Sequence, residues 1–252
     1  MTYPKHPNRN HRLSLEGEIA AAIENLCRSR SMVLTLSHRS RLETTLYETL
    51  IFNRKLRYES SSGALLAKKA IDLLEIFTLR HRVYARLGYD REFPPIIEGL
   101  NFDDFDGHSA VLFTRYAETV TGTCRVIFDS DDKLPIDKNY SLDPLRREYG
   151  RLAELSRLVI DKPTKGLGKE FKHLTAGVYR IMVDNEADAL VSVMSPEHYP
   201  LYRRFGGFEI KDSLPVYGTL RKPFVITAWD VSRISPFFRK IFLGSVAHQA
   251  AA

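Results

Sequence analysis

Apolar side chains recur at helical spacing through the first sixty residues. Between residues 13 and 28, and again between residues 41 and 58, they return every three or four positions, which is the pattern of an amphipathic helix. The serine-rich residues 59–63 that follow indicate a linker. We therefore predict a helical N-terminal extension over residues 1–60.

Beyond the linker, helical and strand patterns alternate. A helix is expected over residues 64–87, ending at Gly88, which suits a C-cap position. The other expected helices cover about 170–185 and 196–205, and the expected strands cover 109–116, 119–127, 154–161, 189–194, 208–210 and 224–229. This order predicts an α/β fold, a mixed central sheet flanked by helices, in a domain over residues 61–230.

The remaining residues, 231–252, have the composition of an amphipathic C-terminal tail. Phe237, Phe238 and Phe242 stand beside Arg239 and Lys240. A segment of this kind can lie in a membrane interface, and packing against the body of the protein or a second subunit is an equal alternative. Membrane-surface contact through the tail is therefore one expectation for this chain.

Composition narrows the class of protein. The 252 residues are 44% hydrophobic and 27% charged, as in soluble globular proteins, and suit one domain with extensions. The two cysteines form no metal-type spacing with histidines, so we expect no metal site and a reducing, cytoplasmic setting. No secretory signal is visible, and no apolar run approaches the ~18–20 residues that span a bilayer.

The net charge of +6 favours acidic partners. The basic residues do not interleave with aromatic ones as in a nucleic-acid-binding module, so we expect no nucleic acid. Arg146, Arg147 and Arg151 lie close together in the sequence. They predict a docking patch for an acidic carrier protein, with a solvated charged face as the alternative.

A glycine-containing loop joins the strand at 154–161 to the next helix. Gly166 and Gly168 let the backbone approach a ligand closely, and Lys165 and Lys169 add positive charge. The helix N-terminus that follows presents free N–H groups to an anion such as a pantetheine phosphate. A plain turn is the alternative interpretation.

The sequence LYRRFGGF, residues 201–208, closely resembles the end of the acyl-donor site in GNAT acyltransferases, with one glycine more than the usual pattern. In that family the matching tyrosine can protonate the departing thiolate, and the resemblance implies this role for Tyr202. Tyr202 could instead only pack. Pro163 stands where the family's phosphate loop usually has Arg or Gln, which favours a phosphopantetheine carrier over coenzyme A.

Four charged motifs, LRHRVYARLGY, NFDDFD, GTCRVI and ELSRLVID, appear in that order. The series resembles the acyl-homoserine-lactone autoinducer synthases and the long-chain N-acyl amino acid synthases over roughly residues 70–210. Both groups are GNAT-fold enzymes that take acyl chains from acyl carrier protein. The substrate-binding or catalytic positions that the resemblance implies are Arg80, Tyr84, Asp103, Asp106, Arg125, Glu154 and Arg157. Asn101 replaces a glutamate of the autoinducer synthases, and Tyr89 replaces their tryptophan, which favours the N-acyl amino acid synthases.

The three arginines of this series are matched by three carboxylates. They can form a structural network of ion pairs, or one arginine can hold the carboxylate of an acceptor. Amide formation requires a neutral amine, and Glu154 is the first choice of base, ahead of His108, His173 and His198. The oxyanion donor is expected to be a backbone N–H near residues 158–160.

Together these features predict an N-acyltransferase that moves a long-chain fatty acyl group from acyl carrier protein to the amine of an amino acid. No bound cofactor is expected, because acyl-phosphopantetheine is a co-substrate. The alternatives are an acyl-coenzyme A-dependent GNAT acyltransferase, an acyl-homoserine-lactone synthase that uses S-adenosylmethionine, and a non-catalytic GNAT binding module.

Overall fold

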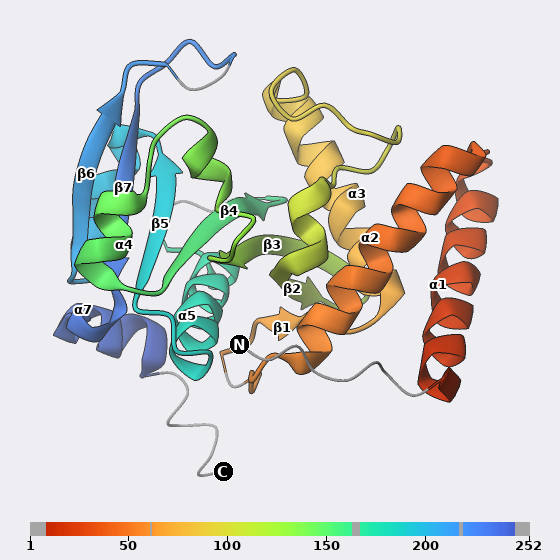
Figure 1. The fold of residues 1–252 in the computed structure, drawn as a ribbon, viewed down its shortest axis with the longest axis horizontal. Coiled ribbons are helices and arrows are strands. Elements are labelled where there is room, and N and C mark those ends of the chain that lie inside the picture. The colour runs from red at the N-terminus through yellow and green to blue at the C-terminus, as the bar shows by residue number, and fades with distance from the viewer. Residues whose placement is uncertain (1–8, 61, 163–166, 217–218, 245–252) are drawn as a thin grey trace.

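A computed structural model describes residues 9–60, 62–162, 167–216 and 219–244 (Figure 1). Its longer helices are α1 (Arg9–Arg30), α2 (Leu36–Lys55), α3 (Ala70–Leu87) and α5 (Lys169–Asp184), and its shorter ones are α4 (Asp143–Tyr149), α6 (Tyr199–Arg203) and α7 (Pro236–Phe238). Its strands are β1 (Leu65–Leu66), β2 (Ser109–Tyr116), β3 (Thr119–Phe128), β4 (Leu152–Ile160), β5 (Ala189–Met194), β6 (Phe208–Leu214) and β7 (Phe224–Asp230).

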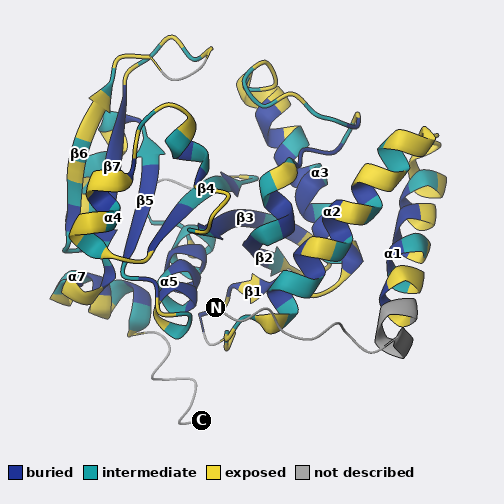
Figure 2. Ribbon diagram, in the orientation of Figure 1, coloured by how far each residue is buried: buried dark blue, intermediate teal, exposed yellow. Residues whose placement is uncertain are grey.

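Within the described residues, seven strands form one sheet in the order β1-β2-β3-β4-β5-β7-β6. Only β4 and β5 run parallel, and the other neighbouring pairs are antiparallel. Side chains that alternate along β2 face opposite cores: Val111 and Phe113 pack with residues of α1–α3, while Ala110 and Leu112 pack with those of α5. Figure 2 shows the buried strands between the helices. The predicted mixed α/β sheet with flanking helices is confirmed.

Most predicted elements are present, and their ends differ. The expected helix over 64–87 is wrong at its start, because residues 65–66 pair with β2 and α3 begins only at Ala70. Helix α2 begins at Leu36, five residues before the expected start, because the Thr35 side chain caps it by accepting a hydrogen bond from the His38 N–H at 3.2 Å. Strand β6 extends to Leu214, past the expected end at 210, through an irregularity between Ile210 and Asp212.

The two N-terminal helices pack against α3 and share one apolar core with it. Helix α2 also contacts the 3-10 turn η1 (Asp104–His108): the Thr49 hydroxyl lies 2.9 Å from the Asp106 carbonyl oxygen. No described helix has the length and apolarity needed to cross a bilayer.

Strand β4 separates from β5 after its first three residues. The parallel pairing runs from Leu152–Ala189 to Glu154–Val191 and stops there, while β4 stays paired with β3 as far as Ile160. The second half of β4 also contains a bulge, because Arg157 and Leu158 both lie opposite one residue of β3. The sheet therefore opens on one side of β4 directly after Glu154.

Candidate active site

The acidic turn that carries Asp103 and Asp106 lies between α3 and β2. Asp103 caps this turn by accepting a hydrogen bond from the Phe105 N–H, and the Asp106 carboxylate accepts one from the Asp103 N–H at 3.0 Å. Asp106 is fully buried. Its other oxygen accepts a hydrogen bond of 2.7 Å from Arg80 Nη1, so the turn is tied to α3.

Asp103 connects two strands to this turn. Its carboxylate pairs with Arg125 of β3 and, at 2.7 Å, with Arg157 Nη2 of β4. Arg125 Nη1 also lies 3.1 Å from Asp106. Burial alone would raise the pKa of Asp103, but the guanidinium groups of Arg125 and Arg157 hold it well below its ordinary value. Asp103 is therefore ionised at neutral pH, and the structure brings the predicted charged residues together.

Arg157 adopts an uncommon backbone conformation. Its φ is 54°, in the left-handed region that a residue with a side chain rarely occupies. This conformation forms the bulge in β4 and directs the guanidinium over the rings of Phe93, at 4.2 Å from the centroid, and Tyr84, at 5.5 Å. Tyr84 was predicted to be at the site, whereas Phe93 was missed because the loop around it carries no motif.

Several buried N–H groups of the described arginines in the cluster donate no hydrogen bond. Within the described part of the chain, Arg80 Nε, Arg80 Nη2 and Arg157 Nη1 are buried without a hydrogen-bond partner. Unpaired buried donors are costly, and a ligand that accepts hydrogen bonds would satisfy them. The cluster holds three guanidinium groups against two aspartate side chains, so it favours an anionic guest at Arg157, whose side chain is 10% exposed while that of Arg80 is fully buried.

Glu154 lies on the same face of β4 as this cluster and is almost fully buried. Its carboxyl accepts a hydrogen bond of 2.9 Å from the Ile136 N–H. Burial raises the pKa of Glu154 to about 7, against the opposing effects of the Ile136 N–H and the Arg125 guanidinium. A carboxyl with this pKa can take up and release a proton near neutral pH, which is what a general base requires.

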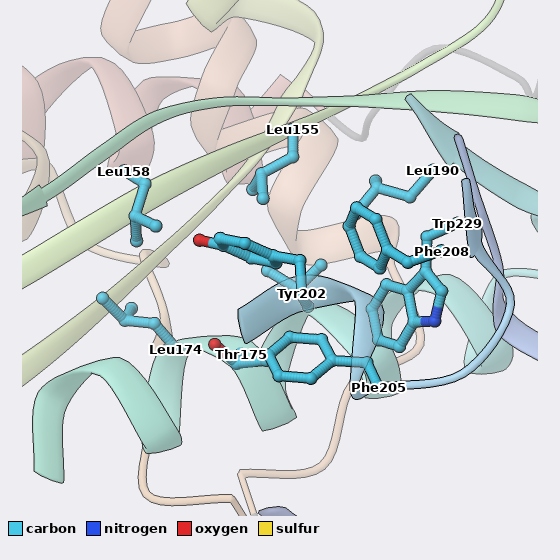
Figure 3. Close-up of a pocket in the computed structure, with 10 residues that line it drawn as sticks. Leu155, Leu158, Leu174, Thr175, Leu190, Tyr202, Phe205, Phe208 and Trp229 are labelled. Atoms are coloured by element: carbon cyan, nitrogen blue, oxygen red, sulfur yellow. The ribbon is translucent and has the colours of Figure 1, made fainter. Parts of the chain in front are cut away.

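The opposite face of β4 lines an apolar pocket (Figure 3). The lining side chains leave a cavity of only about 10 Å³ between them. Its walls come from β4, α5, β5, α6 and the strands β6 and β7: Leu155, Leu158, Leu174, Thr175, Val178, Leu190, Tyr202, Phe205, Phe208 and Trp229. The pocket thus lies at the opening between β4 and β5, and its apolar lining matches a hydrocarbon chain in chemical character.

Tyr202 crosses this pocket. In Figure 3 its ring lies among the lining side chains, with the hydroxyl directed toward Leu158 of β4 and away from Phe208 and Trp229. Burial raises the pKa of the Tyr202 hydroxyl above its ordinary value. The hydroxyl therefore keeps its proton at neutral pH and is available as a hydrogen-bond donor beside β4.

The predicted donor loop is described only in part. Gly168 is the N-cap of α5 and Lys169 is exposed at the first position of that helix. Lys165, Gly166 and Pro163 lie outside the described residues. The N-terminus of α5, a helix of 16 residues, presents backbone N–H groups at the same end of β4 as the pocket.

The predicted docking arginines are mostly paired within the chain. Arg146 contacts the carboxylates of Asp129, Asp137 and Asp143, and Arg151 contacts those of Glu186 and Asp188. Arg147 is exposed. Docking of an acidic carrier through this patch stays a prediction, and Arg146 and Arg151 have little free charge to offer it.

The three histidines considered as bases lie away from Glu154 in the sequence and differ in their surroundings. His108 ends η1 and packs against the Phe105 ring, 5.7 Å between centroids. His173 lies on α5 beneath Gly63, and burial lowers its pKa. His198 ends the short turn before α6. Within the described residues, no group of His, Cys, Asp and Glu side chains is arranged to hold a metal ion.

Comparison with known proteins assigns the chain to a family. The family model described as "N-acyl amino acid synthase FeeM" matches residues 75–230. Among solved structures, FeeM, an N-acyl amino acid synthase from uncultured soil microbes, is 23% identical with a TM-score of 0.55, and the match covers 72% of this chain and 95% of that one. No curated protein matches.

Two lactone synthases are similar in fold. The acyl-homoserine-lactone synthase LasI is 18% identical with a TM-score of 0.51, covering 73% of this chain and 96% of its own. BjaI, a coenzyme A-dependent acyl-homoserine-lactone synthase, is 16% identical with a TM-score of 0.51, covering 70% and 82%. These likenesses show a shared GNAT-like fold.

Proposed function

Since the chain belongs to the FeeM family of N-acyl amino acid synthases and is an N-acyltransferase, we propose that it transfers a fatty acyl group from acyl carrier protein to the amine of an amino acid. The observation that carries this proposal is the separation of β4 from β5 directly after Glu154. It joins the charged cluster on one face of β4 to the apolar pocket on the other. Two substrates of opposite character can therefore meet at one strand.

The acceptor approaches from the charged face. Asp103 is the more exposed of the two aspartates, with 27% of its side chain exposed, and Arg157 beside it has a free Nη1. The carboxylate of an amino acid binds Arg157, and its ammonium group lies toward Asp103 and Glu154. Arg80 is fully buried and only positions Asp106 and, through it, Arg125.

Glu154 removes one proton from the ammonium group. The neutral amine then attacks the thioester carbonyl, forming the C–N bond, and the oxyanion accepts a hydrogen bond from a backbone N–H of β4 in or just after the bulge, near Leu158. The C–S bond breaks as the tetrahedral intermediate collapses. The second amine proton passes to solvent, the departing thiolate takes a proton from the Tyr202 hydroxyl, and solvent returns a proton to the Tyr202 oxygen.

The donor occupies the other face. Gly168 and Lys169 at the N-terminus of α5 hold the pantetheine phosphate, and the acyl chain enters the apolar pocket beside Tyr202. The enzyme needs no bound cofactor for this reaction, because the thioester is itself the activated substrate. Pro163, in place of a phosphate-binding side chain, supports a carrier-bound donor over free coenzyme A.

The test is transfer by the purified protein from acyl carrier protein thioesters and from acyl-coenzyme A to a panel of amino acids, with products identified by mass spectrometry. We expect N-acyl amino acids, formed faster from the carrier thioesters. Glu154→Gln should abolish most of the transfer. Glu118→Gln, in the exposed turn between β2 and β3, is the matched control. Absence of transfer to any amine would refute the proposal, and faster transfer from coenzyme A would refute the choice of donor.

A further inference from the structure

The C-terminal segment Ser235–Leu243 packs behind the apolar pocket. It consists of α7 and the π-helical turn η5 (Arg239–Leu243), and it lies beside α5 in Figure 1. The family match ends at residue 230, before this segment begins. Phe238 and Phe242 of the segment are fully buried, although the turn also carries the exposed Arg239 and Lys240.

Phe205 separates this segment from the pocket. Its ring lines the pocket on one side and contacts two rings of the segment on the other: Phe242 at 4.8 Å and Phe238 at 5.2 Å between centroids. Phe238 and Phe242 stack on each other at 4.8 Å. We name Phe205, Phe238 and Phe242 the aromatic wall. Phe238 and Phe242 lie side by side directly behind Phe205, so the pocket cannot extend in this direction unless the wall changes.

A pair of glycines holds the segment in place. Gly206 and Gly207 follow Phe205 with φ of 79° and 68°. A Cβ at Gly206 would lie 2.5 Å from the Arg233 carbonyl oxygen, and one at Gly207 would overlap the Asp230 carbonyl. The Ser235 N–H also donates a hydrogen bond of 2.7 Å to the Phe205 carbonyl.

The close approach at these positions explains the extra glycine of the sequence. The usual acyl-donor motif has one glycine before its last phenylalanine, and this chain has two. Both adopt a conformation that other residues rarely take, and both are covered by the backbone of residues 230–235. The departure from the family's pattern and the C-terminal segment are therefore parts of one arrangement.

We propose that the aromatic wall closes the far end of the acyl pocket and sets the longest acyl chain that the enzyme transfers efficiently. This inference rests on the proposed acyl transfer. The reacting thioester lies at the Tyr202 hydroxyl, and the chain extends from there toward Phe205, Phe208 and Trp229, the other end of the pocket in Figure 3. A chain that reaches Phe205 meets two rings packed directly behind it, with centroids 4.8 and 5.2 Å away, and closely packed rings yield little.

The test is a competition among acyl chains in a single reaction. Octanoyl, dodecanoyl and hexadecanoyl thioesters, supplied together at equal concentration on the donor that the wild-type enzyme uses, compete for one acceptor. The ratio of long-chain to short-chain product is measured by mass spectrometry. A ratio within one reaction does not depend on the fraction of a variant that is folded, so a loss of stability does not disturb it.

Phe242→Ala removes the ring behind Phe205 and should raise the long-to-short ratio by roughly tenfold, since each added methylene in an apolar pocket is discriminated by at least that factor. Phe242→Leu, which leaves a smaller void, should raise it less. The matched control is Phe237→Ala in the same segment. The Phe237 ring is half-buried and stacks on the guanidinium of Arg204, 4.0 Å from its centroid; it meets Phe242 only edge-on at 6.3 Å and does not line the pocket.

An unchanged ratio in both Phe242 variants, with a wild-type enzyme that transfers acyl groups, would overturn this inference and leave the proposed function standing. An equal shift in Phe237→Ala would also overturn it, because the effect would then not come from the ring behind Phe205. A wild-type protein that transfers none of the chains would refute the proposed function itself.

Discussion

Glu154 offers the sharpest test of the site, because a buried carboxyl kept for catalysis should lower the stability of the fold. The substitution Glu154→Gln removes the charge and keeps the shape. The amide oxygen of Gln can still accept the hydrogen bond from the Ile136 N–H, which is 2.9 Å from Glu154 Oε2. The change therefore isolates the free energy of holding an ionisable group at this position.

The magnitude follows from the pKa of Glu154. A rise from 4.5 to about 7 corresponds to about 3 kcal/mol of lost stability when the group is ionised in both states. Below pH 4.5 the carboxyl is protonated in the folded and the unfolded chain, and nothing is lost. Between 4.5 and about 7 only the unfolded chain releases the proton, so stability falls as the pH rises, and above that range the loss is constant.

Urea unfolding of the wild-type protein and Glu154→Gln at pH 5 and pH 8 measures this effect. The advantage of the Gln variant should grow by roughly 2.5 kcal/mol between the two conditions, while its acyl transfer falls by about a hundredfold or more. Glu118→Gln in the exposed β2–β3 turn controls for the general effect of replacing a glutamate by glutamine on the free energy of unfolding. An advantage of the same size at both pH values would refute the reasoning that Glu154 titrates near neutral pH.

Three further outcomes are expected. Tyr202→Phe should slow transfer by roughly tenfold or more with little change in thermal unfolding, and thioesters of more acidic thiols should recover part of the rate. Asp103→Asn should lower the free energy of unfolding at pH 7 by about 3 kcal/mol in urea titrations, because it removes the carboxylate that pairs with Arg157 and one of the two that pair with Arg125. The wild-type protein should lose this same contribution in acid, since the pKa of Asp103 is depressed and the unfolded chain binds the proton first. Gly207→Ala should lower the melting temperature by about 5 °C or more in calorimetry, because φ at this position is 68° and the backbone of Asp230 covers it.

Much of the fold could be predicted from the sequence because the long elements have clear periodicity. Helices α3 and α5 and strands β2 and β3 each carry enough apolar side chains to mark their type. Strand β1 could not be found this way, since two residues have no period and its pairing with β2 depends on tertiary contact. The missed length of β6 has a similar cause, because an irregularity interrupts the alternation within it.

Which charged residues gather between α3, β3 and β4 was predictable from the ordered motifs, whereas their pairing was not. The ordered motifs identified Arg80, Asp106, Arg125 and Arg157. Nothing in the motifs shows that Arg80 forms an ion pair with Asp106 while Arg157 forms one with Asp103. Those choices depend on the bulge in β4, where a non-glycine residue takes a positive φ. Such a conformation leaves no signature in composition or spacing, because only the surrounding structure imposes it.

The C-terminal segment shows a related limit. Its alternation of phenylalanine and basic residues is equally compatible with a membrane interface and with packing on the protein. The structure packs Phe238 and Phe242 against Phe205. The extra glycine in the motif was visible in the sequence. Its reason is the close approach of the backbone of Arg233 and Ser235 to Gly206, and this approach exists only in the folded chain.

The two halves of the site follow from the alternation of a single strand. Successive side chains of β4 point to opposite faces, so Glu154 faces the charged cluster while Leu155 faces the apolar pocket. In a continuous sheet this arrangement would isolate the two environments from each other. The loss of pairing to β5 after Glu154 removes that barrier at one place, where the bulge at Arg157 and Leu158 follows Glu154 and the Tyr202 hydroxyl is directed toward Leu158. In the proposed reaction, the charged acceptor can then stay in the charged cluster and the hydrocarbon chain of the donor in the apolar pocket until the C–N bond forms. Neither substrate has to enter the environment of the other.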